Sequence, residues 1–194
     1  HLDELDGYVS QARVATTVHE IVNSVGMHDH WAPVLSVLNE AVFERKLDRL
    51  AVVGPPCVAE GARRLMNSEH ALLWPYRDAI RLTISTFCTG MYMPDMVTDL
   101  LEQGKGIARQ QIRSLATSLA DGELKATLWD GAELTIPLTE VEPFTRHGCG
   151  SCDDYLGESA DIAIGAMGAL PDHATLITRT PVGDLFVQNA RRFG

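Results

Sequence analysis

Four cysteines carry the most specific chemistry in this chain. Cys149 and Cys152 form a Cys-x-x-Cys pair in a glycine-flanked loop. Cys57 and Cys88 stand singly further upstream. Four thiolates at one point suit a [4Fe–4S] cluster or a four-thiolate zinc site. Zinc sites more often join two closely spaced pairs, and this chain has one such pair, so the spacing favours iron–sulfur over zinc.

Simpler interpretations of these cysteines stay open. A single cysteine in a protein core usually acts as a small apolar side chain, and a single Cys-x-x-Cys pair can be redox-active or fortuitous. Two disulfides are less favoured, because nothing indicates secretion: the chain opens with His-Leu-Asp-Glu-Leu-Asp, which is acidic where a secretory signal is basic. The residue types alone therefore make a shared metal site one hypothesis among several.

The elements around Cys57 and Cys88 predict that these two residues lie near each other. Short apolar runs predict buried strands over residues 50–54 and 80–87, and each cysteine follows one of these runs. The carboxyl ends of parallel strands share one edge of an open sheet, which is where functional sites usually lie. We therefore expect both thiols at that edge.

The remaining local patterns alternate between helix and strand. Helical spacing of apolar residues predicts helices over residues 32–46, 57–66 and 94–103. Strands are predicted over residues 123–128, 133–136, 160–165 and 175–180, the first two joined as a hairpin by the Asp-Gly turn at 130–131. Thr17 with Glu20 predicts a capping box for a helix that Gly26 ends. Asp184 is expected to cap a final helix that runs to residue 189.

Together these elements predict an α/β fold with a mixed sheet, flanking helices, a small antiparallel insertion and a Cys-rich cluster loop. A single α/β domain over residues 1–194 is expected, because no linker, repeat or low-complexity segment interrupts the chain. The chain has 16 Lys and Arg against 26 Asp and Glu, a net charge of −10, which argues against a general nucleic-acid or membrane-surface binder. No run approaches the roughly 18 apolar residues of a membrane span, and a cytoplasmic location is expected.

Five motifs occur in order along the chain. Residues 53–57 are Val-Gly-Pro-Pro-Cys, residues 87–88 are Phe-Cys, and residues 149–155 are Cys-Gly-Ser-Cys-Asp-Asp-Tyr. Residues 160–165 are Ala-Asp-Ile-Ala-Ile-Gly, and residues 179–183 are Arg-Thr-Pro-Val-Gly. The ordered set resembles the beta-subunit family of coenzyme F420 hydrogenases and dehydrogenases, which also includes formate dehydrogenase beta subunits and plant 7-hydroxymethyl chlorophyll a reductase.

The resemblance implies an iron–sulfur flavoprotein subunit that transfers electrons between the deazaflavin coenzyme F420, or a similar hydride donor, FAD and a [4Fe–4S] cluster. The motif cysteines of the family match Cys57, Cys88, Cys149 and Cys152, which would be the cluster ligands. The partners implied are other subunits of a redox complex or a ferredoxin. The chain lacks the family's upstream Gly-rich flavin segment, so it resembles the middle and C-terminal part of the family. Pro55 stands where threonine is usual, which removes a hydroxyl and a backbone N–H near the cofactors.

Five further residues are candidates for cofactor contacts. Asp161, Gly165 and Gly168 could approach a flavin, although an isolated aspartate is more often a turn or cap residue and the glycines could form a plain turn. Arg146 and Arg179 are candidates for phosphate or coenzyme binding, although an isolated arginine is more often a solvated surface residue. His28-Asp29-His30 is interpreted as a polar loop rather than a metal site. No side chain is assigned as a catalytic acid or base.

Two functions of another class stay open. The same four cysteines could hold zinc in an interaction module without catalysis, or the chain could be a scaffold that holds no cofactor. Visible absorption separates the first from the cluster, because an iron–sulfur protein is brown and bleaches on reduction whereas a zinc protein is colourless.

Overall fold

The computed structural model describes residues 2–3, 7–8, 11–23, 31–118, 121–170 and 173–193. Contacts divide the chain into two compact units, each made of two segments. Unit 1 comprises His1–Pro33 and Gly90–Ser151, and unit 2 comprises Val34–Thr89 and Cys152–Gly194. Each unit buries its own hydrophobic cluster. The expectation of a single domain stays a prediction, because compactness alone does not show whether either unit folds independently.

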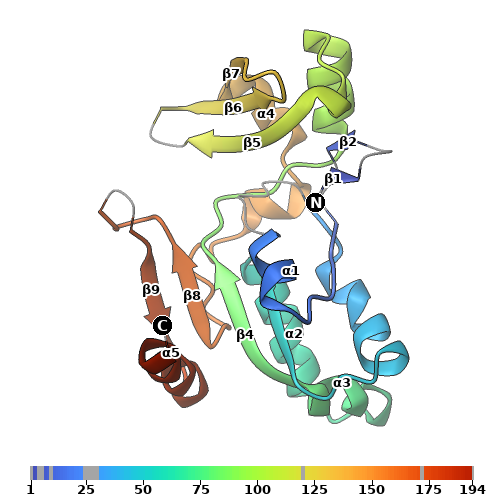
Figure 1. The fold of residues 1–194 in the computed structure, drawn as a ribbon, viewed down its shortest axis with the longest axis vertical. Helices are drawn as coiled ribbons and strands as arrows, with labels where there is room; N and C mark the ends of the chain where they lie inside the picture. Colours follow the sequence, from blue (N-terminus) through green and yellow to red (C-terminus); the bar gives the residue numbers. More distant parts are fainter. Residues whose placement is uncertain are drawn as a thin grey trace. The chain divides into compact units, whose positions relative to one another are not determined.

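Unit 2 is built on a four-stranded mixed sheet (Figure 1). Its strands, in spatial order, are β3 (Leu50–Gly54), β4 (Ile80–Thr86), β8 (Ile162–Gly165) and β9 (Thr175–Thr178). The first three are parallel, and β9 runs antiparallel to β8. All four lie within the segments that the apolar runs predict, so the mixed α/β sheet is confirmed.

Helix α2 (Pro56–Met66) leaves β3 directly and packs against β3 and β4. Pro56 occupies the first turn, where its missing N–H costs no hydrogen bond. Gly54 allows this sharp exit, because a Cβ there would lie 2.9 Å from a methyl group of Val58. The predicted helix over residues 57–66 is therefore confirmed. A short 3-10 turn, η3 (Ala71–Leu73), and helix α3 (Trp74–Ala79) complete the connection to β4.

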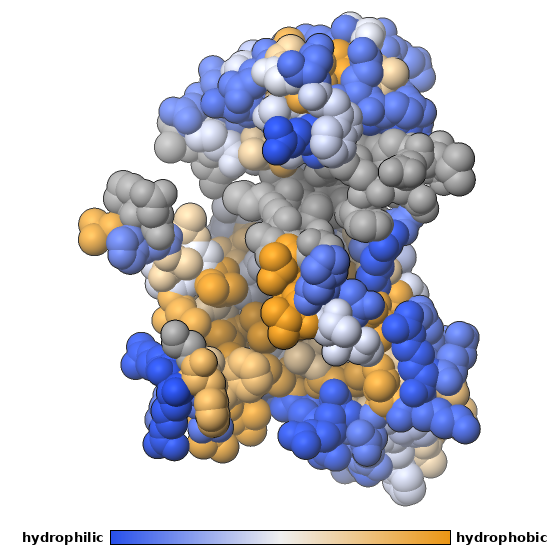
Figure 2. Space-filling model, viewed as in Figure 1, coloured by the Kyte–Doolittle hydropathy of each residue, from blue (hydrophilic) through white to orange (hydrophobic). Residues whose placement is uncertain are grey.

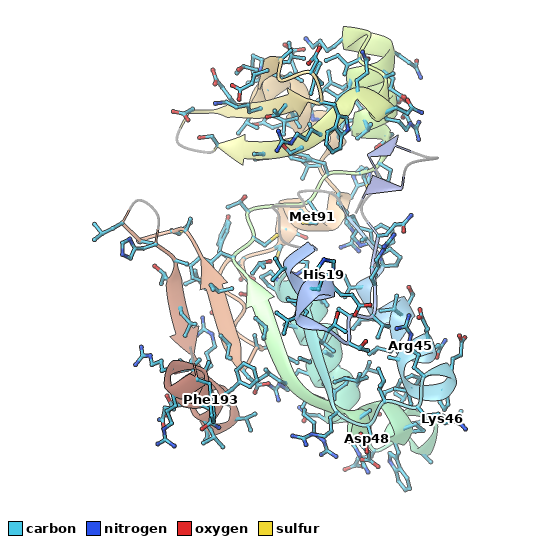
Figure 3. All side chains as sticks on the ribbon, viewed as in Figure 1. His19, Arg45, Lys46, Asp48, Met91 and Phe193 are labelled. Atoms are coloured by element: carbon cyan, nitrogen blue, oxygen red, sulfur yellow. The ribbon has the colours of Figure 1, made fainter. Side chains whose placement is uncertain are left out.

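The helix predicted over residues 32–46 forms, but not as a regular α-helix. It consists of a 3-10 turn, η1 (Val34–Val37), and a wider π-helical segment, η2 (Glu40–Glu44). The Arg45 N–H donates to the Glu40 carbonyl at 2.8 Å, which is the longer-range bond of a π-helix. Lys46, labelled beside Arg45 in Figure 3, then ends the segment with a left-handed φ of 55°.

Unit 1 contains a three-stranded antiparallel sheet of β5 (Ile112–Ser118), β6 (Glu123–Leu128) and β7 (Glu133–Pro137). The predicted β6–β7 hairpin is confirmed, with Gly131 at a φ of +87° in its turn. Strand β5 was not predicted, because a register shift between Ile112 and Ser114 breaks its alternation of buried and exposed residues. The cluster that this sheet buries consists of Met96, Val97, Leu101, Ile112, Leu115, Leu124, Ala126, Ile136 and Val141.

The other elements of unit 1 are short. The helix predicted over residues 94–103 is a π-helical segment, η4 (Met96–Gly104), and η5 (Arg109–Gln111) precedes β5. Helix α4 (Leu138–Val141) and the 3-10 turns η6 (Glu142–Phe144) and η7 (His147–Ser151) follow β7. Two-residue strands β1 (Leu2–Asp3) and β2 (Gly7–Tyr8) pair near the start of the chain. No helix among the described residues is long and apolar enough to cross a membrane.

The predicted capping box at the start of α1 (Val18–Asn23) is confirmed. The Glu20 N–H donates to the Thr17 hydroxyl at 3.2 Å, and the Thr17 N–H donates to a Glu20 carboxylate oxygen at 3.0 Å. These reciprocal bonds satisfy backbone donors that a helix start otherwise leaves unpaired. The Thr16 N–H, which donates to the Glu20 carboxylate at 2.7 Å, and the bonds with Thr17 lower the pKa of Glu20. Gly26 lies outside the described residues.

The predicted cap of the final helix is wrong. Helix α5 (Pro181–Phe193) begins three residues before Asp184 and extends beyond residue 189. The Thr180 hydroxyl accepts the Gly183 N–H at 3.2 Å, so Thr180 caps the helix and Pro181 occupies its first position. Figure 2 shows apolar residues gathered over part of unit 2. Val182 and Phe186 of α5 have exposed side chains.

Substitution of Gly183 tests how closely α5 approaches the sheet. Alanine normally stabilises a helix relative to glycine by about 1 kcal/mol, but a Cβ at Gly183 would overlap the backbone carbonyl of Asp161. We expect Gly183→Ala to lower the free energy of unfolding by about 1–3 kcal/mol, measured by urea denaturation. Gly61→Ala in α2 is the matched control, because its Cβ would meet only the flexible end of Leu35 at 2.8 Å. Equal effects of the two substitutions would contradict this close approach.

Candidate functional site

Cys57 and Cys88 follow the carboxyl ends of two neighbouring parallel strands. Gly54, the last residue of β3, pairs with Ser85 near the end of β4. Cys57 lies in the first turn of α2, where its side chain is exposed, and Cys88 lies just beyond β4, where its side chain is half-buried. The predicted strand arrangement is therefore confirmed, and both residues belong to one edge of the sheet in unit 2.

The segment after Cys152 returns to the same edge. We name residues 152–159 the cysteine loop. The Cys88 N–H donates to the carbonyl of Tyr155 in this loop at 3.0 Å, and the Phe87 N–H donates to the carbonyl of Ile164 in β8 at 2.8 Å. These two bonds fix the backbone of Cys88 between the cysteine loop and β8. Three of the four cysteines thus lie on adjoining segments of unit 2.

Two residues inside the cysteine loop shape it. The Asp154 carboxylate accepts the Gly157 N–H at 2.7 Å and the Glu158 N–H at 3.1 Å, which closes a tight turn. Gly157 has a φ of +68°, and a Cβ there would overlap the side chain of Ser85 in β4. Sequence reasoning assigned neither residue, although Asp154 belongs to the motif that begins at Cys149.

Cys149 belongs to unit 1. It lies in the 3-10 turn η7, where its N–H donates to the Arg146 carbonyl at 2.8 Å and its side chain is half-buried. Gly150 and Ser151 alone join it to Cys152, whose side chain is exposed. A Cβ at Gly150 would meet no other atom within 4 Å, so this part of the motif is not crowded.

The donor set suits a soft metal centre. None of the four cysteines forms a disulfide. In the part of the chain that the structure describes, no three His, Cys, Asp or Glu side chains are grouped as metal ligands. The fit therefore rests on donor chemistry: four thiols are the ligand set of both [4Fe–4S] clusters and structural zinc. The assignment of these cysteines as metal ligands stays a prediction.

Asp161, a predicted flavin contact, is buried among hydrogen-bond donors. Its side chain belongs to a residue that is only 2% exposed. Oδ1 accepts from Arg63 Nη2 and Thr180 Oγ1, each at 2.7 Å. Oδ2 accepts from the backbone N–H of Thr83 at 2.8 Å and from its hydroxyl at 2.9 Å. All four bonds come from the protein itself, so they give a structural reason for a carboxylate here, and the flavin contact stays a prediction.

Arg63, Thr83, Asp161 and Thr180 form what we name the Asp161 network. Arg63 lies on α2, Thr83 on β4, Asp161 directly before β8 and Thr180 directly before α5. Arg63 Nε also donates to the Ser159 carbonyl at 3.1 Å, which ties the end of the cysteine loop to α2. No local sequence signal pairs Arg63 with Asp161, because 98 residues separate them.

Burial acts against the charged form of Asp161 and would raise its pKa. Hydrogen bonds from Thr180, Arg63 and Thr83 outweigh this effect, and the pKa of Asp161 lies below its ordinary value. The carboxylate therefore stays charged in the folded protein near neutral pH. The lowered pKa stabilises the folded protein at pH values at which Asp161 of the unfolded chain is also ionised.

Two other predicted flavin contacts have defined protein neighbours. A Cβ at Gly165 would overlap the ring of Phe87, so this glycine makes room for the residue before Cys88. Gly168 has a φ of +76° in the turn after β8, where the Thr175 hydroxyl donates to the Met167 carbonyl at 2.8 Å. Both positions need glycine for packing or backbone conformation, and their flavin contacts stay predictions.

The two predicted phosphate-binding arginines lie in different units. Arg179 Nη2 donates to the Leu156 carbonyl of the cysteine loop at 3.2 Å. In unit 1, the Arg146 guanidinium lies over the ring of Trp31, 5.7 Å from its centroid. The backbone N–H of Arg146 donates to the carbonyl of Met91, labelled in Figure 3, at 2.9 Å. Residues 28–30, predicted as a polar loop, lie outside the described residues.

Substitution of Asp161 tests the network energetically. Asp161→Asn places an amide NH₂ among donors and leaves the Arg63 charge uncompensated, so we expect it to lower the free energy of unfolding by about 3 kcal/mol near neutral pH. Because the folded pKa is lowered, this difference should persist above the unfolded pKa of about 4 and shrink as the pH falls below it. Urea denaturation of metal-free protein across this range measures the difference.

Glu60→Gln is the control for Asp161→Asn, because Glu60 pairs with Arg64 on the exposed side of α2. It should change the free energy of unfolding by less than about 0.5 kcal/mol at every pH. A difference between wild type and Asp161→Asn that stays constant down to the acid-unfolding limit would contradict a lowered pKa in the folded protein.

Comparison with known proteins identifies relatives along most of the chain. An uncharacterised protein of Methanocaldococcus jannaschii is 34% identical over 182 residues, which are 93% of this chain and 49% of that protein. The coenzyme F420 hydrogenase subunit beta of Methanococcus voltae is 27% identical over 185 residues, which are 95% of this chain and 64% of that subunit. The chain therefore spans about half to two thirds of the length of these relatives.

A chain of the F420-reducing [NiFe] hydrogenase complex from Methanosarcina barkeri has the same fold. The match has a TM-score of 0.85 at 23% sequence identity and covers 95% of this chain and 62% of that chain. The family model for the C terminus of the coenzyme F420 hydrogenase/dehydrogenase beta subunit matches residues 47–194. With most of its length matched by that model, this chain belongs to the coenzyme F420 hydrogenase/dehydrogenase beta-subunit family.

Proposed function

We propose that this chain is an electron-transfer subunit of an oxidoreductase, in which Cys57, Cys88, Cys149 and Cys152 bind one [4Fe–4S] cluster. The observation that carries the proposal is the convergence of three cysteine-bearing segments on one sheet edge of unit 2, where the Cys88 N–H is bonded to the cysteine loop. The fourth ligand, Cys149, adjoins that loop through two residues. Membership of a family of redox subunits supports the same conclusion.

The chain's own contribution is to hold the thiols and to limit their motion. Cys57 is carried by the first turn of a packed helix, the Cys88 N–H is bonded to the cysteine loop, and the N–H of the preceding Phe87 is bonded to β8. The cysteine loop is closed by Asp154 and packed on β4 through Gly157. When bound, the cluster supplies one-electron transfer and the flavin supplies hydride chemistry.

The named relative from Methanococcus voltae is a coenzyme F420 hydrogenase subunit, and we extend its coenzyme to this chain as part of the proposal. Coenzyme F420 would then exchange hydride with FAD, and the other subunits of a redox complex or a ferredoxin would exchange single electrons with the cluster. The proposed cofactor contacts are Asp161, Gly165, Gly168, Arg179 and Arg146. Arg146 is proposed as an anion contact because a guanidinium over an aromatic ring keeps N–H donors at its edge.

Metal analysis of anaerobically purified protein tests the cluster. We expect about four iron atoms and a broad visible absorption that bleaches on reduction. Cys88→Ser should lower the iron content to less than about half, because a missing thiolate leaves an iron site without its ligand. Ser151→Ala, within the same motif but without a thiol, is the control and should keep full iron content. A colourless protein that holds zinc would overturn the cluster and support the interaction module.

Equilibrium dialysis with FAD tests the flavin part of the proposal. Arg146→Gln should weaken FAD binding by about tenfold or more, since a charge-assisted hydrogen bond to phosphate contributes about 1.5–3 kcal/mol. Arg64→Gln is the control, because Arg64 is exposed and paired with Glu60 on α2. Unchanged affinity of Arg146→Gln would remove Arg146 from the site, and an absence of FAD binding by the wild-type protein would overturn the flavin assignment for this chain.

A further inference from the structure

A buried charged side chain of unit 2, Asp161, is hydrogen-bonded to the helix that carries Cys57 and to the strand that leads to Cys88. Among the described residues in the buried class, Asp161 is the one with a charged side chain. A buried carboxylate is costly unless it is fully hydrogen-bonded, so its partners are held in fixed positions. Those partners come from α2, which carries Cys57, and from β4, which leads to Cys88.

Arg63 is the member of the Asp161 network that also reaches the cysteine loop. Its guanidinium donates from Nη2 to Asp161 Oδ1 at 2.7 Å and from Nε to the Ser159 carbonyl at 3.1 Å. Nη2 also lies 3.3 Å from the Thr83 hydroxyl oxygen. A planar guanidinium serves such divergent acceptors at once, whereas the ammonium of lysine is a single point donor. One side chain thus joins α2, β4 and the end of the cysteine loop.

The cysteine loop depends on such contacts because it contains no helix or strand. Its backbone carbonyls are held by the Cys88 N–H at Tyr155, by Arg179 at Leu156 and by Arg63 at Ser159. Of these three donors, Arg63 is the one carried by the helix of Cys57. Removing the Arg63 guanidinium would break the bond between α2 and the cysteine loop, and it would leave Asp161 with an uncompensated buried charge.

We infer that Arg63 is a positioning residue for the cysteine site: it holds α2, β4 and the cysteine loop in the arrangement from which Cys57, Cys88 and Cys152 bind the cluster. This inference rests on the proposed function for the identity of the metal centre. Metal sites depend on such outer contacts because ligands that are already placed lose less freedom when the metal binds. Arg63 itself is 26% exposed and needs no contact with the cluster to act in this way.

Anaerobic reconstitution with iron and sulfide tests the inference. Arg63→Lys keeps the positive charge but loses the separate Nε and Nη2 donors of the guanidinium. We expect its rate of cluster incorporation to fall by about tenfold to a hundredfold. Arg64→Lys, one residue along the same helix and paired with exposed Glu60, is the matched control and should reconstitute like wild type. Normal reconstitution of Arg63→Lys would overturn the inference.

A second control separates positioning from general stability. Leu38→Ala removes a buried side chain from the core of unit 2 without touching the Asp161 network, and it should lower stability at least as much as Arg63→Lys. The inference requires Leu38→Ala to incorporate the cluster at the wild-type rate under conditions where circular dichroism shows all variants folded. Equal slowing by Leu38→Ala and Arg63→Lys would assign Arg63 a stabilising role alone.

Alkylation of the metal-free protein gives a readout that does not depend on iron. Iodoacetamide labelling followed by peptide mass spectrometry measures the reaction rate of each cysteine. In Arg63→Lys the half-buried Cys88 should react about tenfold faster than in Arg64→Lys or Leu38→Ala, because a released loop no longer covers its backbone. If wild type takes up no iron, the proposed function fails, and the alkylation rates alone then support or overturn the positioning role.

Discussion

The structure of unit 2 depends on the compensation of one buried negative charge. Asp161 lies before a central strand, and its carboxylate accepts four hydrogen bonds from three residues that are distant in sequence. A buried charge is stable only when it is fully hydrogen-bonded, so the three elements that supply donors are held to the carboxylate that precedes β8. The Asp161 network therefore helps to fix the arrangement of α2, β4, β8 and α5.

The same constraint gives a structural role to motif residues that are also proposed as cofactor contacts. Asp161 and Gly165 belong to one motif, and both contact other protein groups: the first binds Arg63, Thr83 and Thr180, and the second makes room for Phe87. Thr180, from the last motif, caps α5 and donates to Asp161. These residues therefore organise the segments around Cys57, Cys88 and Cys152 through contacts within the protein.

Local signals predicted the elements well where each residue pattern matched its final environment. The apolar run over residues 50–54 coincides with β3, and the Asp-Gly turn marks the β6–β7 hairpin. The prediction failed at β5, where a register shift hides the alternation of buried and exposed residues. It also failed at Asp184, because Thr180, four residues earlier, accepts the Gly183 N–H and caps the helix. Helical spacing located the segment after Pro33 but did not distinguish π-helical from α-helical bonding, because both present similar apolar faces.

The sequence by itself determined the four thiols, the placement of Cys57 and Cys88 after predicted strands and the ordered motifs that mark the family. Those features depend on residue identity or on neighbouring residues, so the sequence alone reveals them. Only the tertiary structure decided that Arg63 compensates Asp161, that Tyr155 accepts the Cys88 N–H, and that Cys149 belongs to a different compact unit from the other three cysteines. Such pairings join residues far apart in the chain, and a long-range hydrogen bond leaves no periodic or compositional trace in the residues that make it.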